Sequence, residues 1–362
     1  MKLLYITNIP APYRQKRFNA MAEIFPKYGI DFEVLYMAKI ESNRQWMISD
    51  DSYNYPYKIF KGIHPTVGRF FAHLNPGLLL RLLKNDYDVA VVGGMASPTH
   101  WLSPFCILGH KLQIMSVESN LYSVNRKKGI GAKIKSFLLN KADAYQVTGE
   151  PQIEYITYFQ PKAKNKKFIR MPNLIDEEVF LEKVDKLKDQ KESLRQEFGV
   201  LPGAQMWVIP ARLIAIKGII PFLEALKDYK GFRLFLLGDG PQASLIKSII
   251  KANNLPVSMA GFVQQNEVIR YLAAADLFIL PSFKDPSPLT PIEAIAAGLP
   301  VMVSRNIGNL KEVLGKQNGW FFEPGNIEEI KKMVESVLNL SRDDLKNKGL
   351  KSRKQYLRFY SV

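Results

Sequence analysis

The stretch "DLFILPSFKDPSPLTPIEAIAAGLPVMVS", residues 276–304, carries the clearest fold signal in the chain. It opens with a short apolar run, passes through a proline-rich loop into a helical segment at 291–298, and closes with a second apolar run at 300–304. Short buried strands that alternate with helices are typical of βαβ units, in which helices cover a parallel sheet. We therefore expect two parallel strands joined by one helix here.

The same alternation extends along all 362 residues. Strand-like runs of the first half fall at 2–9, 31–38, 88–94, 112–119, 144–149 and 167–173. Those of the second half fall at 206–212, 232–240, 257–263, 276–282, 300–304 and 319–325. Amphipathic helical stretches lie between them. We predict an α/β fold of two doubly wound domains, with ligands beyond the carboxyl ends of the strands in the cleft between domains.

The polar, charged stretch 174–204 separates the two halves. Because it contains no strand-like run, we predict an interdomain connection that includes a solvated helix. The expected organisation is a first domain at 1–173, this connection, a second domain at 205–345, and a C-terminal helix at 346–362 that packs near the domain junction.

The composition suits a protein of the reducing cytosol. Hydrophobic residues make up 47% of the chain, enough for two cores, and no run approaches the roughly 20 apolar residues of a membrane span. The N-terminus reads as a first buried strand rather than a signal peptide. The one cysteine, Cys106, excludes an intrachain disulfide, and the four histidines are scattered without metal-ligand spacing, so no metal site is proposed.

The net charge of +16 is concentrated in the first half. Residues 1–170 hold 24 Lys and Arg against 12 Asp and Glu. Such a basic domain suits an anionic surface, either membrane headgroups or nucleic acid, or else it only aids solubility. No nucleic-acid-binding motif is present, so a nucleic-acid partner is not expected.

Two carboxylates, Asp285 and Glu293, flank a proline-rich loop. Pro291 suits a first helical turn, which would place Thr290 at the N-cap and Glu293 at N3, the spacing of a capping box. The same helix start could instead offer N–H groups to a diphosphate, with the Glu293 carboxylate accepting hydrogen bonds from sugar hydroxyls. Both interpretations of Glu293 stay open at this point, and Asp285 is expected in the loop.

Two other features of the second half suit a phosphate ligand. "ARLIAIKG" follows a strand and places Arg212 and Lys217 five residues apart, where both could reach a pyrophosphate. "LLGDGP" places Gly238 and Gly240 at a strand end, where backbone can approach a ligand closely.

The order of "ARLIAIKG", "LLGDGP", "AGFV", "DLFILPSFKDPSPLTPIEAIAAGLPV", "GNLKEVL" and "NGWFFEPGN" resembles the donor half of family 4 glycosyltransferases. In the first half, "YITNIPAPYR" and "MPNLID" look like the first loop and the interdomain segment of that family. The resemblance covers nearly the whole chain. It implies the GT-B fold, two Rossmann-like doubly wound domains facing across a cleft, with acceptor bound by the first and nucleotide-sugar donor by the second.

The resemblance also assigns roles to individual residues. Arg212 and Lys217 match the basic pair that stabilises the donor diphosphate as leaving group, Asp285 matches a carboxylate that faces the transferred sugar, and Glu293 matches one that holds the ribose. The remaining donor-side residues are Gly238, Gly240, Leu289 and Thr290 near the phosphates and Gly261, Phe262 and Val263 beside the base. The residues implied on the acceptor side are Asn8, Tyr13, Arg14 and Glu118.

Three departures from the family pattern concern the sugar more than the enzyme class. The first carboxylate is Asp285 where glutamate is usual, and Pro288 stands where glycine is common. Glu118 occupies roughly the place of a sugar-contacting histidine.

The resemblance implies a retaining glycosyltransferase that moves a hexose-type sugar from a UDP- or GDP-linked donor to a glycan or lipid-linked acceptor, without a metal or another cofactor. Cell-surface polysaccharide biosynthesis is the expected context. The basic first domain and the segment "GRFFAHLNPGLLLRLLK" suggest peripheral docking on the inner face of an anionic membrane, although a core-facing helix explains the segment equally well. The alternatives are a GT-B nucleotide-sugar epimerase and a non-catalytic basic protein that binds membrane or nucleic acid.

Overall fold

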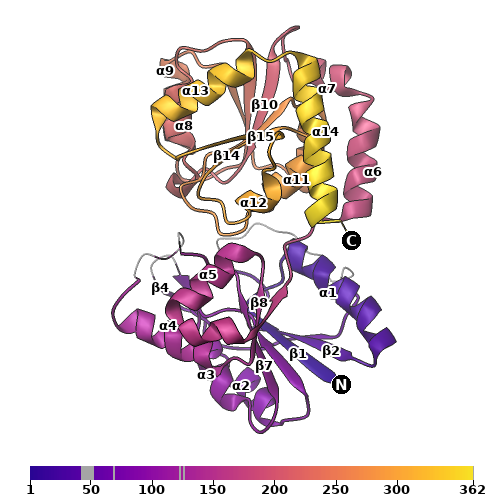
Figure 1. Cartoon of the computed structure of the whole chain (residues 1–362), viewed down its shortest axis with the longest axis vertical. Coiled ribbons are helices and arrows are strands. Elements are labelled where there is room, and N and C mark those ends of the chain that lie inside the picture. Colours follow the sequence, from indigo (N-terminus) through magenta and orange to yellow (C-terminus); the bar gives the residue numbers. More distant parts are fainter. Residues whose placement is uncertain (42–52, 68–69, 122–123, 125–126, 362) are drawn as a thin grey trace. The chain divides into compact units, whose positions relative to one another are not determined.

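The computed structural model describes residues 1–41, 53–67, 70–121, 124 and 127–361 (Figure 1). The contacts within the chain divide it into two compact units, Met1–Leu174 and Ile175–Val362. Each unit is built around a parallel sheet with helices on both faces, which confirms the predicted α/β class.

The first unit contains a seven-stranded parallel sheet in the order β3-β2-β1-β6-β7-β8-β9, so the strand order reverses between β1 and β6. Its strands are β1 (Lys2–Thr7), β2 (Asp31–Tyr36), β3 (Tyr57–Ile59), β6 (Val89–Val92), β7 (Leu112–Val117), β8 (Ala144–Val147) and β9 (Lys167–Arg170). A short antiparallel pair is made by β4 (Thr66–Val67) and β5 (Phe70–Phe71). The α-helices are α1 (Pro12–Ile24), α2 (Pro76–Leu83), α3 (Pro98–Cys106), α4 (Ile130–Lys141) and α5 (Glu150–Phe159), with 3-10 turns at Phe25–Tyr28 and Pro161–Asn165.

Both faces of this sheet are buried. Leu3 and Tyr5 of β1 pack with Phe18 of α1, whereas the alternate residue Ile6 packs with Leu78 of α2 on the other face. Because successive side chains of a strand point to opposite faces, a strand covered on both sides must be apolar throughout. This explains why β1 contains an uninterrupted apolar run from Leu3 to Ile6.

The second unit contains a six-stranded parallel sheet in the order β12-β11-β10-β13-β14-β15, which reverses between β10 and β13. Its strands are β10 (Gln205–Pro210), β11 (Phe232–Leu237), β12 (Val257–Gly261), β13 (Leu277–Leu280), β14 (Val301–Ser304) and β15 (Gly319–Phe322). Its α-helices are α6 (Glu177–Lys188), α7 (Lys191–Glu197), α8 (Ile219–Ala225), α9 (Ala243–Ala252), α10 (Gln265–Ala274), α11 (Thr290–Ala296), α12 (Leu310–Val313), α13 (Ile327–Leu338) and α14 (Arg342–Phe359), with a 3-10 turn at Ala215–Lys217.

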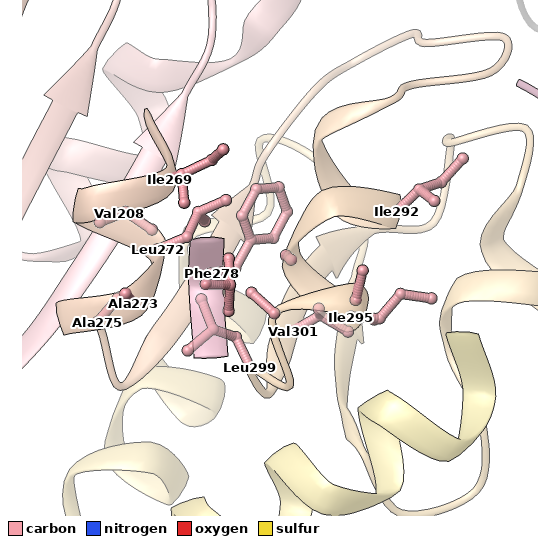
Figure 2. Packing of buried hydrophobic residues seen from close by; sticks show 14 of the residues in the cluster. Val208, Ile269, Leu272, Ala273, Ala275, Phe278, Ile292, Ile295, Leu299 and Val301 are labelled. Atoms are coloured by element: carbon pink, nitrogen blue, oxygen red, sulfur yellow. The ribbon is translucent and has the colours of Figure 1, made fainter. Parts of the chain in front are cut away.

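The core of the second unit has the same two-sided construction. Val208 and Phe278, on neighbouring strands, pack with Leu272 of α10 in the cluster shown in Figure 2. Trp207, the preceding residue of β10, packs on the other face with Phe222 of α8. The apolar runs predicted as strands in this half all lie in this sheet.

The segment predicted as an interdomain connection, 174–204, packs with the second unit. It contains α6 and α7, both of which pack against α10, and Phe180, Val184 and Leu194 are buried in the core beside β10. The chain therefore crosses from one unit to the other after Leu174, next to the predicted boundary at 173. The apolar stripe of α6 is narrow among its charges, which explains why the segment reads as solvated.

A buried ion pair anchors α7 to the sheet. The Asp276 carboxylate, directly before β13, accepts hydrogen bonds from Arg195 at 2.6 Å, from Lys191 at 2.7 Å and from the Met206 N–H at 2.8 Å. Burial by itself would raise the pKa of the Asp276 carboxyl, but Lys191 and Arg195 outweigh it and hold that pKa below its ordinary value.

The C-terminal helix α14 begins at Arg342, earlier than the predicted residue 346, because Ser341 and Asp344 form a capping box. The helix packs against α11 and α12 of its own unit. Three short strands of the first unit, β3, β4 and β5, were not predicted, since two or three residues are too few to show a period.

Candidate active site

The loops after β10 and β13 meet at the point where the strand order of the second sheet reverses. Doubly wound sheets bind ligands at such a point, beyond the carboxyl ends of the strands. Here Lys217, from the loop after β10, forms an ion pair with the carboxylate of Asp285, from the loop after β13. The two side chains are only 16% and 13% exposed. The structure thus joins two residues that the sequence places 68 positions apart.

The two loops are also fastened through their backbones. The Phe283 N–H donates to the Ile216 carbonyl at 2.8 Å. Gly218 follows Lys217 with φ of +65°, and a Cβ on it would lie 2.1 Å from the Pro281 carbonyl oxygen. Any side chain at Gly218 would therefore push apart the loops that hold the ion pair.

The loop after β10 is held on its other side by the loop after β11. The Ala211 N–H donates to the Leu237 carbonyl at 3.0 Å. A Cβ on Gly238 would lie 2.1 Å from the Ala211 carbonyl oxygen, and one on Gly240 would lie 2.5 Å from the Leu213 carbonyl oxygen. Both glycines are thus required where two backbone segments touch, a reason that involves no ligand.

Arg212 lies between these fastened residues and is exposed. Its backbone position is fixed by its neighbours, because the N–H groups of Ala211 and Leu213 donate to the end of β11 and to the loop after it. A long, exposed cation on a rigid backbone at the switch point is suited to an anionic ligand.

A third loop supports Asp285. Asp285 forms a parallel bridge with Ile307, after β14, in which its N–H donates to the Asn306 carbonyl at 3.3 Å and its carbonyl accepts from the Gly308 N–H at 2.8 Å. Further along, the Asn309 side chain donates to the Pro288 carbonyl at 2.9 Å. The "GNLKEVL" segment therefore fixes the loop that carries the carboxylate.

The capping box that was one of the two interpretations of the start of α11 is not formed. The helix includes Thr290 as its first residue, the N-cap is Leu289, and no side chain caps it. Leu289 already has helical φ and ψ of −81° and −37°, so the turn begins one residue earlier than the capping spacing requires. Glu293 consequently falls at the fourth helical position, and it is only 6% exposed.

This result changes the balance between the two interpretations of Glu293. The interpretation in which Thr290 caps α11 from outside the helix does not apply, because Thr290 is itself helical. The position of Glu293 in the first turn of the helix after β13, at the switch point, fits a residue that holds a polar ligand.

The residues predicted beside the nucleotide base lie at the end of β12 and directly after it, not after β10 or β13. Gly261 ends β12, the edge strand two places from β10, and it is followed by an exposed Phe262 and a partly buried Val263. Gly261 has φ of +72°, and a Cβ on it would meet no atom within 4 Å, so its backbone conformation, and not space, favours glycine.

The first unit has a polar cluster at its own switch point. Arg14 of α1 donates to Thr7 at 2.8 Å and to Asn8 at 2.9 Å, both at the end of β1, and to Glu118 after β7 at 3.0 Å. Three of the four residues implied on the acceptor side are therefore brought together. The fourth, Tyr13, lies in α1, but its side chain is outside the described residues.

The Glu118 carboxylate is charged in this setting. Burial by itself would raise its pKa, but the guanidinium groups of Arg14 and Arg17 outweigh burial and hold the pKa below its ordinary value. Glu118 thus stands where a histidine is common in the resembling family, and two arginines neutralise its carboxylate.

A hydrogen-bonded chain that the sequence did not suggest extends from this cluster to the surface. The Asn8 side chain donates to Glu41 at 2.9 Å, the same carboxylate oxygen contacts His73 Nε2 at 3.0 Å, and His73 Nδ1 lies 2.9 Å from His64 Nδ1. Nothing in the local sequence could have paired these histidines, because the contacts join separate loops.

His100 is a second residue that the sequence did not single out. It lies in the first turn of α3 beside Gly94, just beyond β6, and it is 3% exposed. Among the described residues, neither of its ring nitrogens has a hydrogen-bond partner. Burial, with His73 and Arg14 nearby, lowers the pKa of His100 to about 3, so the ring is neutral and offers one donor and one acceptor.

The second unit matches a known family from α6 onward. Residues 182–354 fit the family model described as "Glycosyl transferases group 1". Over these residues the second unit is similar to group 1 glycosyltransferases. Lys217, Asp285 and Glu293 all lie within the matched residues, and the cluster around Arg14 lies outside them.

Curated relatives of this domain are named for the synthesis of several glycans and glycolipids. The chain is 28% identical over 148 residues to the "Putative teichuronic acid biosynthesis glycosyltransferase TuaC" of Bacillus subtilis, covering 41% of this chain and 36% of that protein. It is 29% identical over 152 residues to the "Alpha-monoglucosyldiacylglycerol synthase" of Acholeplasma laidlawii, covering 40% and 38%. These alignments span about a third of the length of the curated relatives.

Solved structures extend the likeness to both units. Anabaena HepE in complex with UDP has a TM-score of 0.75 at 16% identity, covering 99% of this chain and 96% of that one. WaaG, a glycosyltransferase involved in lipopolysaccharide biosynthesis, has a TM-score of 0.66 at 15% identity, covering 98% and 95%. At these identities the likeness shows the fold, which is GT-B, as the sequence resemblance implied.

The described residues of both units show neither a metal-binding cluster nor a helix that could span a membrane. No group of three or more His, Cys, Asp or Glu side chains in these residues is arranged to hold a metal ion. Among the helices in the described part of the chain, none combines the length and the apolar character of a bilayer span.

Proposed function

We propose that this protein is a retaining glycosyltransferase that moves a hexose-type sugar from a nucleotide-diphosphate sugar to a glycan or lipid-linked acceptor. The observation that carries the proposal is the Lys217–Asp285 ion pair at the switch point of a domain similar to group 1 glycosyltransferases. UDP is the first donor nucleotide to consider, because related folds have been solved with UDP and with UDP-glucose.

On the donor side, Arg212 and Lys217 would bind the diphosphate. Cations that face the oxygens where negative charge develops stabilise the transition state more than the bound donor, and so increase the rate. Two such cations can supply the charge that a metal supplies elsewhere, so we propose transfer that requires no metal. Asp285, fixed by the Ile307 bridge, would face the sugar, and Glu293 would hold the ribose hydroxyls.

The proposed step breaks the bond between the anomeric carbon and the diphosphate oxygen. Its electron pair leaves with the nucleoside diphosphate, while positive charge develops on the sugar ring. The acceptor hydroxyl then forms the new bond on the same face, and its proton passes to the leaving phosphate oxygen. Retention of configuration follows from attack on that face, and no protein nucleophile is needed.

On the acceptor side, Asn8, Arg14, Glu118 and His100 would surround hydroxyl groups. The Arg14–Glu118 pair offers both donors and acceptors, and the neutral His100 ring can donate to one hydroxyl and accept from another. A buried ring with two unused hydrogen-bonding atoms suits a ligand that supplies both.

The context we propose is the synthesis of a cell-surface polysaccharide. TuaC and the "Putative colanic acid biosynthesis glycosyltransferase WcaL" of Escherichia coli both carry such a role in their names. We further propose that the enzyme works in the cytoplasm, on the inner face of the membrane, where lipid-linked acceptors would be available.

A thermal-shift panel of UDP-, GDP-, ADP- and dTDP-sugars tests the donor proposal. A ligand that binds only the folded state raises the unfolding free energy by about 2.7 kcal/mol at a hundred times its Kd. A UDP- or GDP-sugar should raise the Tm of the wild type, and the shift should shrink in Lys217→Ala. If no nucleotide sugar shifts the Tm, the proposal fails. If a bound donor is isomerised without any acceptor, the protein is an epimerase instead.

A further inference from the structure

Helices α3 and α4 are neighbours in the first unit (Figure 1). Both carry large apolar side chains that are exposed. On α3 and the residues after it, Trp101, Leu102, Phe105 and Leu108 are between 43% and 49% exposed. On α4 the exposed residues are Ile130, Ile134 and Phe137, between 47% and 79%. The spacing of four and three residues puts the α4 side chains on one face of that helix.

The two sets of side chains form one continuous surface. The rings of Phe105 and Phe137 are stacked, with centroids 5.9 Å apart and planes at 25°. Lys141 Nζ lies 5.3 Å from the centre of the Phe105 ring and 5.6 Å from that of Phe137. We call this surface, formed by the seven apolar residues above and Lys141, the α3–α4 face.

The two helices that form the α3–α4 face carry positive charges and no negative ones. Neither α3 nor α4 contains Asp or Glu. Exposed Lys127, Lys128 and Lys133 precede or lie on α4, and Lys141 ends it. Long lysine side chains can lay their stems along apolar groups while the ammonium stays at a polar boundary, as the position of Lys141 over two rings shows.

We propose that the α3–α4 face docks on an anionic lipid bilayer. Single exposed apolar residues are ordinary, but a contiguous apolar patch with a basic rim fits a membrane surface, where apolar groups enter the acyl boundary and cations meet the headgroups. A second copy of the chain is a poor partner for the face, because it would bring like charges together. The inference uses the proposed function only to explain why docking would be useful, namely access to a lipid-linked acceptor.

This surface is not the one suggested by the sequence. The segment around α2 sends Leu78 and Leu82 into the core, as expected of a core-facing helix. Arg69 and the side chains of Phe70 and Phe71 lie outside the described residues. Leu80 and Leu83 of α2 are exposed, at 64% and 44%, but the aromatic rings that stack on each other and lie under Lys141 belong to α3 and α4.

Co-sedimentation with vesicles tests the charge requirement. The full chain should bind vesicles that contain phosphatidylglycerol and bind pure phosphatidylcholine weakly. Each lysine near an anionic surface contributes about 1 kcal/mol, so Lys133→Gln combined with Lys141→Gln should weaken binding about 30-fold. The matched double variant Lys247→Gln with Lys251→Gln, on α9 of the other unit, should bind like the wild type. Equal weakening by both double variants would overturn the proposal, because it would show a dependence on net charge alone.

A second pair of variants tests the apolar part. Ile134→Glu should weaken binding more than Leu83→Glu, which changes a similarly exposed residue of α2. Vesicles of brominated phosphatidylglycerol should quench part of the tryptophan emission of the wild type. This quenching should be smaller in Trp101→Phe, because Trp101 is the tryptophan on the α3–α4 face. Equal binding by the two glutamate variants, or quenching that Trp101→Phe does not reduce, would overturn the proposal.

Two controls separate docking from the other possibilities. UDP-glucose binding, measured by calorimetry, should be unchanged in the vesicle-binding variants, so loss of docking cannot be confused with misfolding. If UDP-glucose does not bind while docking behaves as expected, the docking surface stands and that donor is wrong. The protein could also self-associate in the absence of lipid. If Ile134→Glu abolishes such self-association, a second copy of the chain occupies the α3–α4 face, and the proposal is overturned.

Discussion

Replacement of Lys217 by methionine is the most informative change in the candidate active site. Methionine keeps most of the side-chain volume and removes the charge. If Lys217 faces the diphosphate as it departs, its loss should lower turnover by about 10²- to 10³-fold, or about 2.7–4 kcal/mol of transition-state stabilisation. Donor affinity should fall much less, because the charge that the lysine stabilises grows during the reaction.

The ion pair adds an effect on stability that can be separated from the effect on turnover. Lys217 and Asp285 are mostly buried, at 16% and 13% exposure, so water screens them less than a surface pair. Loss of one partner leaves the other charge partly desolvated, and we expect a cost of about 1–3 kcal/mol in unfolding free energy. Adding Asp285→Asn to Lys217→Met should recover part of that cost, since neither charge is then left alone.

Turnover should be measured as release of nucleoside diphosphate from the donor identified by thermal shift, and stability by urea denaturation of the same preparations. Lys247→Met, an exposed lysine on α9, is the matched control and should alter neither quantity. Unchanged turnover in Lys217→Met would refute the proposed role of the lysine. A stability loss without a turnover loss would show that the pair only joins two loops.

Three further changes test other parts of the second unit. Gly238→Ala should lower the Tm and weaken donor binding together, because its Cβ would lie 2.1 Å from the Ala211 carbonyl oxygen; a Tm equal to that of the wild type would contradict this. Glu293→Ala should weaken donor binding, and a loss of urea stability without any loss of donor affinity would assign Glu293 a structural role only. Asp276→Asn should destabilise the protein at neutral pH by about 3–5 kcal/mol, since Arg195 is left buried without a full negative partner. Because the pKa of Asp276 is held below its ordinary value, its stabilising effect is present above that value and lost as the pH falls through the lowered pKa, so wild type and Asp276→Asn should converge in stability in acid.

The sheets of this protein could be predicted because their strands are buried on both faces. The middle of a strand such as β1, from Leu3 to Ile6, is apolar at every position, which makes it visible in the sequence without any knowledge of its neighbours. The packing of segment 174–204 with the second unit could not be predicted, for the opposite reason. Helices α6 and α7 bury only a narrow stripe, and their many charges obscure it.

The start of α11 shows a limit of motif spacing. Thr290 and Glu293 have the separation of a capping box, but the box requires Thr290 to lie outside the helix. Whether a residue has helical or extended φ and ψ depends on the loop that precedes it, and the Pro288 carbonyl of that loop is fixed by Asn309, 21 residues further along. Such a long-range contact leaves no trace in the local sequence.

The sequence by itself determined the class of the fold and the succession of two doubly wound units, and it singled out candidate carboxylates and cations in the second one. Those properties depend on periodicity and on order along the chain, which are local. The tertiary structure alone decided that Lys217 contacts Asp285, that Gly238 and Gly240 are needed where backbones touch, and that His64, His73 and Glu41 form one chain. It also placed the exposed apolar surface on α3 and α4, because only packing decides which face of an apolar helix is covered.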